Sequence, residues 1–212
     1  MRVVVLFSGG KDSVLATSWA MKQGFEPVLV TVKPPEYSMM FHHPNVEFTK
    51  YQAEAMGLPQ EFVETTEENW REKLIEKLKE LGVKAIVTGA IASEYQKKRI
   101  DSMAAELGIP AHAPLWHREE SIIKEIKSLE VYVTAVSAEG LDEKFLGEPL
   151  QKLLDANVPG IHRLLEGGEG ETFVTDAPFF KKRITIKSWD KSFDGVRGVA
   201  KIKEIEIKEK SS

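Results

Sequence analysis

The stretch Ser8-Gly9-Gly10-Lys11-Asp12-Ser13 decides the fold that this sequence predicts. It follows the apolar run 2–7 and precedes a helical pattern over 14–23. A strand that passes through two glycines into a helix is typical of a phosphate-binding turn, because glycine lets bare backbone N–H groups approach an anion. The first turn of the helix adds unpaired N–H donors and the positive end of the helix dipole. We therefore predict an anion site at residues 8–13.

The side chains of this stretch suit the same ligand. Lys11 can place an ammonium group on phosphate oxygens, and Ser8 and Ser13 offer hydroxyl donors. The spacing is not that of a Walker A loop or of the dinucleotide pattern G-x-G-x-x-G. It resembles the SGGxDS loop of the N-type ATP pyrophosphatases, enzymes that cleave ATP between its α and β phosphates and hold the departing pyrophosphate in this loop. An ordinary glycine-rich turn with Asp12 near the start of a helix is the alternative.

Strand and helix signals alternate over the first half of the chain. Apolar runs predict strands at 2–7, 27–32, 61–64, 84–88 and 109–113. Helical patterns separate them at 14–23, 46–56, 65–81, where Thr65 and Glu68 suggest a capping box, and 93–107, where Ser93 is the expected cap. This alternation predicts right-handed βαβ units and an α/β fold with a Rossmann-like parallel sheet, of the adenine nucleotide alpha hydrolase type that the resemblance implies.

The pattern changes in the second half. A helix at 118–129 and a short helix at 149–156 accompany strands with period-2 alternation at 130–137, 172–175, 183–189 and 199–207. We expect a smaller α+β domain here. The predicted division is an ATP-binding domain over 1–117 and a second domain over 118–212 that recognises the acceptor substrate.

Composition restricts the function classes. The chain has 212 residues, a net charge of -4 and no cysteine. The charge argues against broad nucleic-acid binding, and the lack of cysteine excludes disulfides, thiolate metal sites and a thiol nucleophile. A buried type of strand starts at the amino end and no apolar run has the length of a membrane span, so we expect a cytoplasmic protein without signal peptide or membrane partner. Abundant Lys and Glu favour a thermophile.

Two further stretches carry chemistry. Gly89 opens the segment 89–99 after a predicted strand, and Glu-Gly-Gly-Glu-Gly-Glu-Thr occupies 166–172. Together with the loop at 8–13, Pro114-Leu115-Trp116 and the Asp-x-Pro at 176–178, they resemble the diphthine–ammonia ligase family over residues 1 to 180. That family makes the last amide of diphthamide on elongation factor 2. The chain departs from the family pattern at Gly170, where an aromatic residue is commoner, and at Glu148, where arginine is usual.

The resemblance implies an ATP-dependent amide ligase. Such an enzyme adenylates the diphthine carboxylate of elongation factor 2 with ATP and Mg²⁺, amidates it with ammonium, and releases AMP and pyrophosphate. The chemistry is reasonable, because an acyl-adenylate is a far better electrophile than a carboxylate, provided that the phosphates are held in line and water is excluded. A glutaminase with a cysteine nucleophile is impossible in this chain, so free ammonium is the expected nitrogen donor.

The candidate residues follow from the loop and from this resemblance. The predicted catalytic residues are Lys11, Asp12, Glu169 and Glu171. The predicted ATP-binding residues are Ser8, Gly9, Gly10, Lys11, Asp12, Ser13 and Gly89, with adenine near the backbone of Leu6, Phe7 and 30–32. The predicted substrate-binding residues are Glu94, Tyr95, Gln96, Arg99, Trp116, Glu166 and Thr172. The irregular segment 36–44 lies where α/β folds bind ligands. The histidines show no metal-ligand spacing, so we predict no metal-binding residues.

The acidic string has two interpretations. Glycines between Glu166, Glu169 and Glu171 allow the carboxylates to converge, and like charges so gathered need a cation. Ammonium, Mg²⁺ or the trimethylammonium group of diphthine would supply one. A solvated acidic turn is the plainer interpretation.

Two other functions stay open. One is a tRNA-modifying ATP pyrophosphatase, although thiolation through a persulfide needs a cysteine that the chain lacks. The other is a non-catalytic ATP-binding regulatory module, which would leave the intact loop at 8–13 and the string at 166–172 unexplained. Pyrophosphate release separates a ligase from such a module. Homo-oligomerisation is also left open by the sequence.

Overall fold

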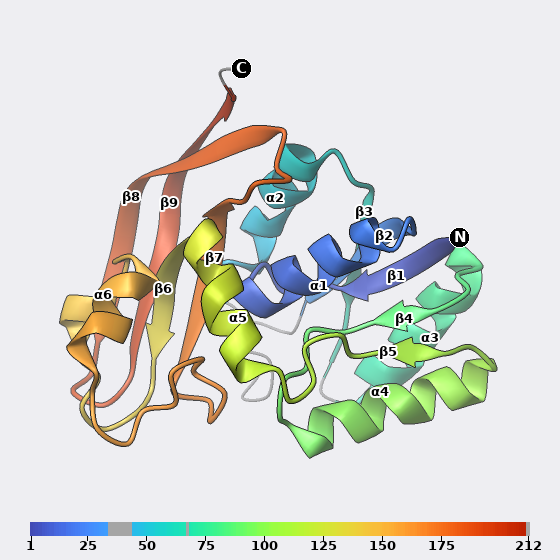
Figure 1. Ribbon diagram of the computed structural model, residues 1–212, viewed down its shortest axis with the longest axis horizontal. Coiled ribbons are helices and arrows are strands. Elements are labelled where there is room, and N and C mark those ends of the chain that lie inside the picture. The colour runs from blue at the N-terminus through green and yellow to red at the C-terminus, as the bar shows by residue number, and fades with distance from the viewer. Residues whose placement is uncertain (34–43, 67, 211–212) are drawn as a thin grey trace.

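Two β-sheets stand side by side in the computed structural model (Figure 1), which describes residues 1–33, 44–66 and 68–210. In this described part, the first sheet is parallel and has the strand order β3-β2-β1-β4-β5. Its strands are β1 (Arg2–Leu6), β2 (Glu26–Lys33), β3 (Gln60–Glu64), β4 (Ile86–Val87) and β5 (Ala111–His112). The predicted α/β class with a Rossmann-like parallel sheet is confirmed.

Helices cover both faces of the parallel sheet. Val3 and Val5 of the central strand β1 pack toward α1 (Lys11–Lys22) and α2 (Thr49–Met56), whereas Val4 packs toward α3 (Trp70–Leu81) and α4 (Glu94–Leu107). All three valines are fully buried. A strand that is apolar on both faces is what a parallel sheet between two helical layers requires. The carboxyl end of β1 therefore reaches the edge where the loop 8–13 begins.

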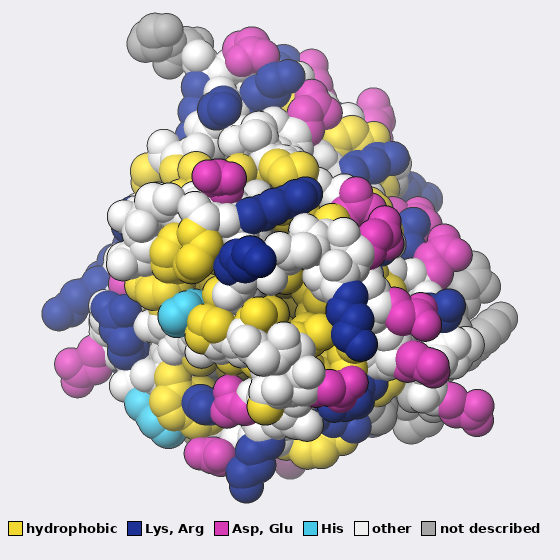
Figure 2. All heavy atoms as spheres, turned by 90° about the vertical axis from the view of Figure 1, so that its right-hand side faces the viewer, with side chains coloured by type: hydrophobic (Ala, Val, Ile, Leu, Met, Phe, Trp, Pro, Cys, Tyr) yellow, Lys and Arg dark blue, Asp and Glu magenta, His cyan; other side chains and the backbone are white. Residues whose placement is uncertain are grey.

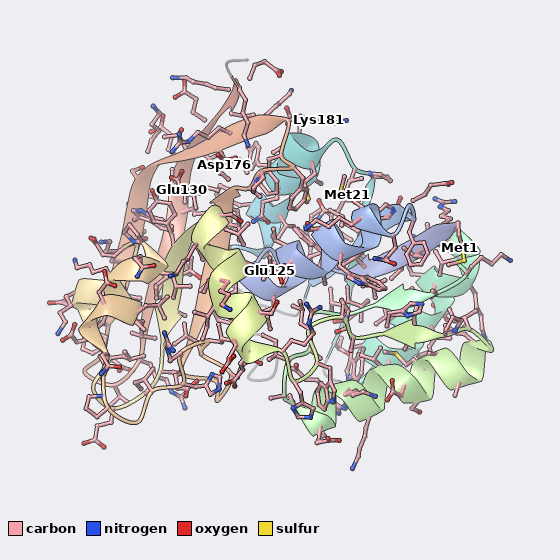
Figure 3. All side chains as sticks on the ribbon, viewed as in Figure 1. Met1, Met21, Glu125, Glu130, Asp176 and Lys181 are labelled. Atoms are coloured by element: carbon pink, nitrogen blue, oxygen red, sulfur yellow. The ribbon has the colours of Figure 1, made fainter. Side chains whose placement is uncertain are left out.

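The second sheet is antiparallel, with the order β7-β6-β9-β8 among the described residues. Its strands are β6 (Glu130–Val136), β7 (Gly170–Asp176), β8 (Lys182–Phe193) and β9 (Gly198–Glu209), accompanied by α5 (Glu119–Glu125) and α6 (Leu150–Ala156). Figure 3 shows Glu130 and Asp176, partners in the register of β6 and β7, at one end of this sheet. The smaller α+β part that the sequence predicts is thus present.

One apolar core joins the two sheets. The cluster that contains Val5 and Leu15 of the first sheet layer continues to Val133 and Val174 of the second. β7 consequently lies beside the start of α1, where the Val174 N–H donates to the Gly9 carbonyl at 3.2 Å. This contact brings the segment 166–172, whose last three residues belong to β7, next to the glycine loop.

Several local predictions need correction. The helix expected over 46–56 begins as a 3₁₀ turn at Val46–Phe48 before α2, and the helix expected over 118–129 ends in a 3₁₀ turn at Ile126–Ser128. The capping box expected at Thr65 and Glu68 was wrong, because α3 begins at Trp70 with Asn69 in the N-cap position. In the turn before α3, the Asn69 N–H donates to the Thr66 hydroxyl at 3.2 Å and the Thr66 N–H to the side-chain Oδ1 atom of Asn69 at 2.7 Å, while Thr65 is buried.

Two surface features complete the description. On the side nearest the N-terminus, basic and acidic side chains are interspersed (Figure 2). In the described part of the chain, every helix is too short or too polar to cross a lipid bilayer. The segment predicted at 36–44 falls outside the described residues except for Pro44.

Candidate active site

The loop between β1 and α1 is held by its own hydroxyl groups. Gly9 has a φ of +82°, and Gly10 precedes the first helical residue with an extended conformation. The Ser13 hydroxyl donates to the Gly10 carbonyl at 3.0 Å and accepts the Gly9 N–H at 3.1 Å. The loop therefore has one defined shape before any ligand binds.

Gln52 of α2 clamps this loop to the second sheet. Its amide nitrogen donates to the carbonyl oxygens of Gly9 and Val174, at 2.8 Å each, and the side chain is fully buried. A Cβ on Gly9 would lie 2.4 Å from the Gln52 Oε1 atom, so the close approach requires glycine. Sequence reasoning missed Gln52, because a lone glutamine in a helical pattern gives no signal of such a role.

The amide groups that we expected to be bare are covered by neutral hydroxyl oxygens. The Gly10 N–H donates to the Ser8 hydroxyl at 3.4 Å, and the Lys11 N–H donates to the Thr172 hydroxyl at 3.2 Å. Both bonds are long for N–H to oxygen contacts. An anionic oxygen accepts more strongly than a hydroxyl, so a phosphate group can replace these acceptors with a gain in bond strength.

Gly89 brings the segment 89–99 against the start of helix α1. A Cβ at Gly89 would lie 2.7 Å from the carbonyl carbon of Asp12 and 2.9 Å from the Ser13 nitrogen. Only glycine permits this approach of two backbones. Ser93 then caps α4, as predicted, by accepting the Gln96 N–H at 3.3 Å.

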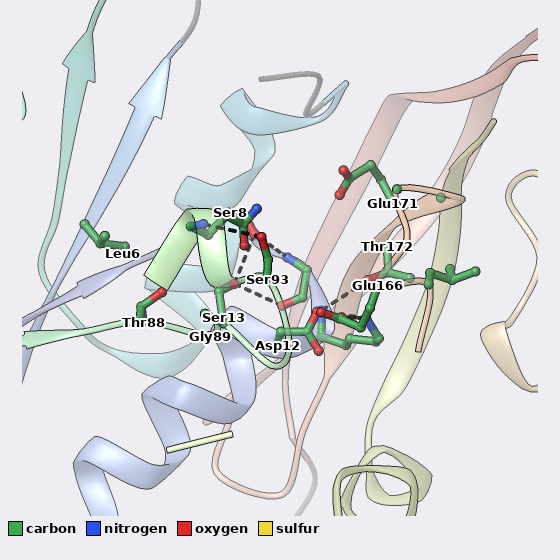
Figure 4. A pocket seen from close by; sticks show the side chains of 17 residues that line it. Leu6, Ser8, Asp12, Ser13, Thr88, Gly89, Ser93, Glu166, Glu171 and Thr172 are labelled. Carbon is green, nitrogen blue, oxygen red and sulfur yellow. Dashed lines mark hydrogen bonds and ion pairs between the residues drawn. The ribbon is translucent and has the colours of Figure 1, made fainter. Parts of the chain in front are cut away.

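The three stretches meet in a polar cavity of about 330 Å³ (Figure 4). Its lining from the loop and the β4–α4 connection includes Ser8, Gly10, Lys11, Asp12, Ser13, Gly89 and Gln96. Its lining from the acidic string includes Glu166, Glu171 and Thr172. Groups more than 150 positions apart in the sequence thus face one space, as the separation of 161 between Lys11 and Thr172 illustrates.

An apolar cavity of about 160 Å³ adjoins the polar one. The two cavities share Leu6 and Ser8 as lining residues. The other lining residues of the apolar cavity are Phe7, Val30, Val32, Trp70, Leu74 and Ile100. An apolar slot beside a polar space with backbone donors has the chemistry to take a flat ring joined to phosphates.

Lys11 is buried among carboxylates in the polar cavity. It is 3% exposed, and its ammonium group lies 2.8 Å from the Asp12 Oδ2 atom and 3.8 Å from the Glu166 Oε1 atom. The second Asp12 oxygen, Oδ1, is buried without a hydrogen-bond partner. The structure therefore places two acids against one base, and when both acids are ionised the group is net negative and can take a further cation.

Burial changes the acidity of both acids. Desolvation raises the pKa of the Asp12 carboxyl, with a smaller contribution from the nearby Glu171, against the lowering effect of Lys11. Desolvation, followed by the charge of Asp12, raises the pKa of Glu166 to about 7, although Lys11 and His162 act in the opposite direction. Glu166 can therefore exchange a proton near neutral pH.

Glu169 has a different environment from its two neighbours. Its carboxylate accepts the N–H groups of His162 at 3.0 Å and Gly167 at 2.7 Å, and it is not among the residues that line the polar cavity. Glu166 and Glu171 do line that cavity. Of the three carboxylates that we expected to converge, two therefore lie in the cavity, and the third, that of Glu169, holds the backbone of its own loop.

The other predicted substrate-binding residues divide in the same way. Gln96, Glu166 and Thr172 line the polar cavity, whereas Glu94, Tyr95, Arg99 and Trp116 do not. Arg99 stacks its guanidinium group over the rings of Trp70, at 4.8 Å, and Tyr95, at 4.2 Å. The Trp116 ring contacts the His117 ring, with centroids 4.5 Å apart. Across residues 1–33, 44–66 and 68–210, no three Asp, Glu or His side chains are grouped as metal ligands.

Comparison with known proteins gives matches over both halves of the chain. The family model for the diphthamide synthase N-terminal domain matches residues 1–111, and that for the diphthamide synthase C-terminal domain matches residues 118–207. Diphthine–ammonia ligase of Bos taurus is 33% identical in an alignment that covers 98% of this chain and 92% of the relative. The Homo sapiens enzyme of the same name is 31% identical with the same coverage.

Among solved structures, a predicted subunit of tRNA methyltransferase from Methanocaldococcus jannaschii superposes with a TM-score of 0.50. The match covers 84% of this chain and 98% of that chain at 17% sequence identity. At this identity the likeness concerns the fold alone, and it agrees with the α/β class described above.

Proposed function

Because the chain belongs to the diphthamide synthase family, we propose that it is an ATP-dependent diphthine–ammonia ligase. In this proposal it joins ammonium to the carboxylate of diphthine on elongation factor 2 and releases AMP and pyrophosphate. The observation that carries the proposal is the bond between the Lys11 N–H and the Thr172 hydroxyl, since it joins the phosphate-type loop to the acidic string in one cavity.

ATP would occupy both cavities. The adenine ring suits the apolar cavity next to Leu6 and Phe7, and the phosphates suit the polar cavity, where their oxygens would replace the Ser8 and Thr172 hydroxyls on the Gly10 and Lys11 N–H groups. The helix α1 adds the positive end of its dipole to the same position. This arrangement stabilises the charge that develops on departing pyrophosphate.

Mg²⁺ would enter with ATP. The oxygen-rich lining of the polar cavity suits a hard cation, which commonly keeps several water molecules and binds through substrate phosphates. Since the described residues offer no group of three metal ligands, we assign the ion to the phosphates and name no protein ligand. Its charge would offset the carboxylate of Asp12 when Lys11 turns toward phosphate.

The first step forms the acyl-adenylate. A diphthine carboxylate oxygen attacks the α phosphorus, the bond to the bridging oxygen breaks, and pyrophosphate leaves toward the loop 8–13. Ammonia then adds to the acyl carbon and AMP leaves, so that an amide remains. We propose that residues 118–212, which supply Glu166, Glu171 and Thr172, recognise the acceptor, and that residues 1–117 bind ATP.

The test is a complete reaction. The protein is incubated with ATP, Mg²⁺, ammonium and elongation factor 2 that carries diphthine, and the products are AMP, pyrophosphate and a factor whose mass changes by conversion of one carboxyl to one amide. AMP formation that needs the acceptor supports the ligase. AMP formation with tRNA in place of the factor, or nucleotide binding without any pyrophosphate release, would instead support the modifying enzyme or the regulatory module.

A further inference from the structure

We propose that Glu166 is the base that takes a proton from ammonium, so that neutral ammonia forms beside the acyl-adenylate. The inference rests on the function proposed above and adds a catalytic role to one side chain of that site. Ammonium has no free lone pair, so an amide ligase that uses it must remove one proton before the carbon–nitrogen bond can form.

The position of Glu166 already accommodates a primary ammonium group. The Lys11 Nζ atom lies between it and Asp12, at 3.8 Å from the Glu166 carboxylate, and the Glu166 side chain is 16% exposed. Figure 4 shows Glu166 beside Asp12 in the polar cavity, close to Thr172. If phosphate draws Lys11 toward the loop, a free ammonium ion can take a place among the same carboxylates.

The surroundings of Glu166 match the task of a base near neutral pH. Burial and the charges of Asp12 and Glu119 raise its pKa, and Lys11 and His162 restrain the rise, so that it comes to about 7. A general base is most effective when its pKa lies near the working pH, since it is then both ionised and basic enough to accept the proton. An ordinary solvent-exposed glutamate would be ionised but much less basic.

The neighbouring acids are less suited to the role. The Glu169 carboxylate is occupied by the N–H groups of His162 and Gly167. Asp12 accepts a hydrogen bond from Lys11 at 2.8 Å and lies in the first turn of α1, at the phosphate loop. Glu171 lines the cavity as well, and the experiment below therefore compares it directly with Glu166.

The proton balance of the step is complete. Glu166 in its ionised form accepts one proton from ammonium, which leaves neutral ammonia with a lone pair. The lone pair forms the carbon–nitrogen bond to the acyl-adenylate, the nitrogen then loses a second proton to solvent, and the carbon–oxygen bond to AMP breaks with its electron pair on AMP. The Glu166 carboxyl returns its proton to solvent before the next turnover.

Replacement of the nucleophile tests the role. Hydroxylamine is a weaker base that is largely unprotonated at neutral pH, and it attacks acyl-adenylates without prior deprotonation. We expect Glu166→Gln to lower amide formation from ammonium by about 10²- to 10⁴-fold, while hydroxamate formation from hydroxylamine and acceptor-dependent ATP–pyrophosphate exchange fall by less than about tenfold. Glu166→Asp, which keeps a carboxylate, should recover part of the ammonium rate.

A control variant and the ATP–pyrophosphate exchange reaction distinguish the possible results of this experiment. Glu125→Gln on the surface of α5 should leave both nucleophiles unaffected, and retained exchange shows that the Glu166→Gln protein is folded. Equal losses with ammonium and hydroxylamine, an unchanged ammonium rate, or a selective ammonium defect in Glu171→Gln instead would overturn the assignment. Absence of acceptor-dependent exchange in the unaltered protein would contradict the proposed function rather than the role of Glu166.

Discussion

At the scale of single residues, Lys11, Asp12 and Glu166 form a buried charged group in the polar cavity. One ammonium group faces two carboxylates whose pKa values are raised by burial. Such an arrangement is costly in the free protein, because charges buried without full compensation destabilise the folded state. In the proposed function, a bound nucleotide with its cation would compensate these charges, so we infer that the group serves binding rather than stability.

Glu166 should make stability depend on pH. The folded protein holds the Glu166 proton up to a pH of about 7, whereas the unfolded chain releases it near the ordinary value of 4.5. The folded state thus binds more protons between these values, and the stabilisation present below pH 4.5 is lost as the pH rises through 7. We expect the stability of the unaltered protein relative to Glu166→Gln to fall by about 3 kcal/mol from pH 4 to 8.

Urea unfolding of both proteins over this pH range measures the difference. Asp12 titrates in both proteins, but its charge is coupled to Glu166, so the difference between the two curves measures the Glu166 proton together with this coupling. Parallel stability curves for the two proteins would show that Glu166 does not titrate in this range.

Lys11→Ala should remove activity and keep the fold. The side chain would no longer reach the phosphates, and the loss of a preorganised cation at developing charge costs about 10²-fold or more in rate. We expect AMP formation to fall at least that far, with an unchanged circular dichroism spectrum. An AMP formation rate equal to that of the unaltered protein would contradict the phosphate assignment.

Sequence could predict the loop at 8–13 but could not distinguish the three glutamates. The residue types and spacing of Ser8 to Ser13 indicate phosphate binding by themselves. The direction of each glutamate side chain depends instead on backbone angles within a glycine-rich turn. Gly168 has a φ of +79° and Leu165 a φ of +58°, and these angles direct Glu169 to backbone N–H groups. The long-range pairing of Lys11 with Glu166 has no local sequence signal either.

At the scale of elements, the junction of β1, α1 and α2 depends on one glycine. Gly9 has a φ of +82° and no room for a Cβ, whereas Gly24, at the end of α1, has a φ of +73° and open space around it. Gly24→Ala should cost about 1–2 kcal/mol for the left-handed conformation alone. Gly9→Ala should cost about 1–3 kcal/mol more, because the added methyl group collides with Gln52.

Chemical unfolding of both variants checks this difference. Binding of ATP should also weaken in Gly9→Ala and stay unchanged in Gly24→Ala. Equal losses of stability in the two variants would mean that the loop moves away from Gln52 without cost.

The clamp made by Gln52 should be measurable in the same way. Gln52→Ala removes both donors to the Gly9 and Val174 carbonyls and opens space in the core, so we expect a loss of at least about 1–3 kcal/mol in unfolding free energy. Gln151→Ala on α6 is a control, because that exposed glutamine bonds to Asp155 on its own helix. Similar small losses of unfolding free energy in both variants would show that Gln52 does not clamp the loop.

Most elements could be predicted from periodicity, and the errors have local causes. Strand β1 and helix α4 agree with expectation within a residue, because their burial patterns are continuous and Ser93 and Gly108 terminate α4. Helix α3 starts later than expected, at Trp70, with Asn69 in the N-cap position. The Thr65 N–H donates to the Lys33 carbonyl beside the sheet, and Thr66 bonds with Asn69 in the turn before the helix.

At the scale of the whole molecule, the site exists only where the two sheets meet. The loop 8–13 follows a strand of the parallel sheet, Glu171 and Thr172 lie in β7 of the antiparallel one, and Glu166 precedes that strand. A common apolar core holds the two sheets together. Sequence patterns describe each half, but the contact between halves depends on packing that no local pattern encodes. The link between the motifs at 8–13 and 166–172 could be predicted only from the family resemblance.

A crystal structure with an ATP analogue that cannot be cleaved between its α and β phosphates tests the central claim most directly. We predict that the β and γ phosphates lie in the polar cavity, accept hydrogen bonds from the Gly10 and Lys11 N–H groups, and displace the Thr172 hydroxyl. Phosphates bound elsewhere, with the bond from Lys11 to Thr172 intact, would contradict the account.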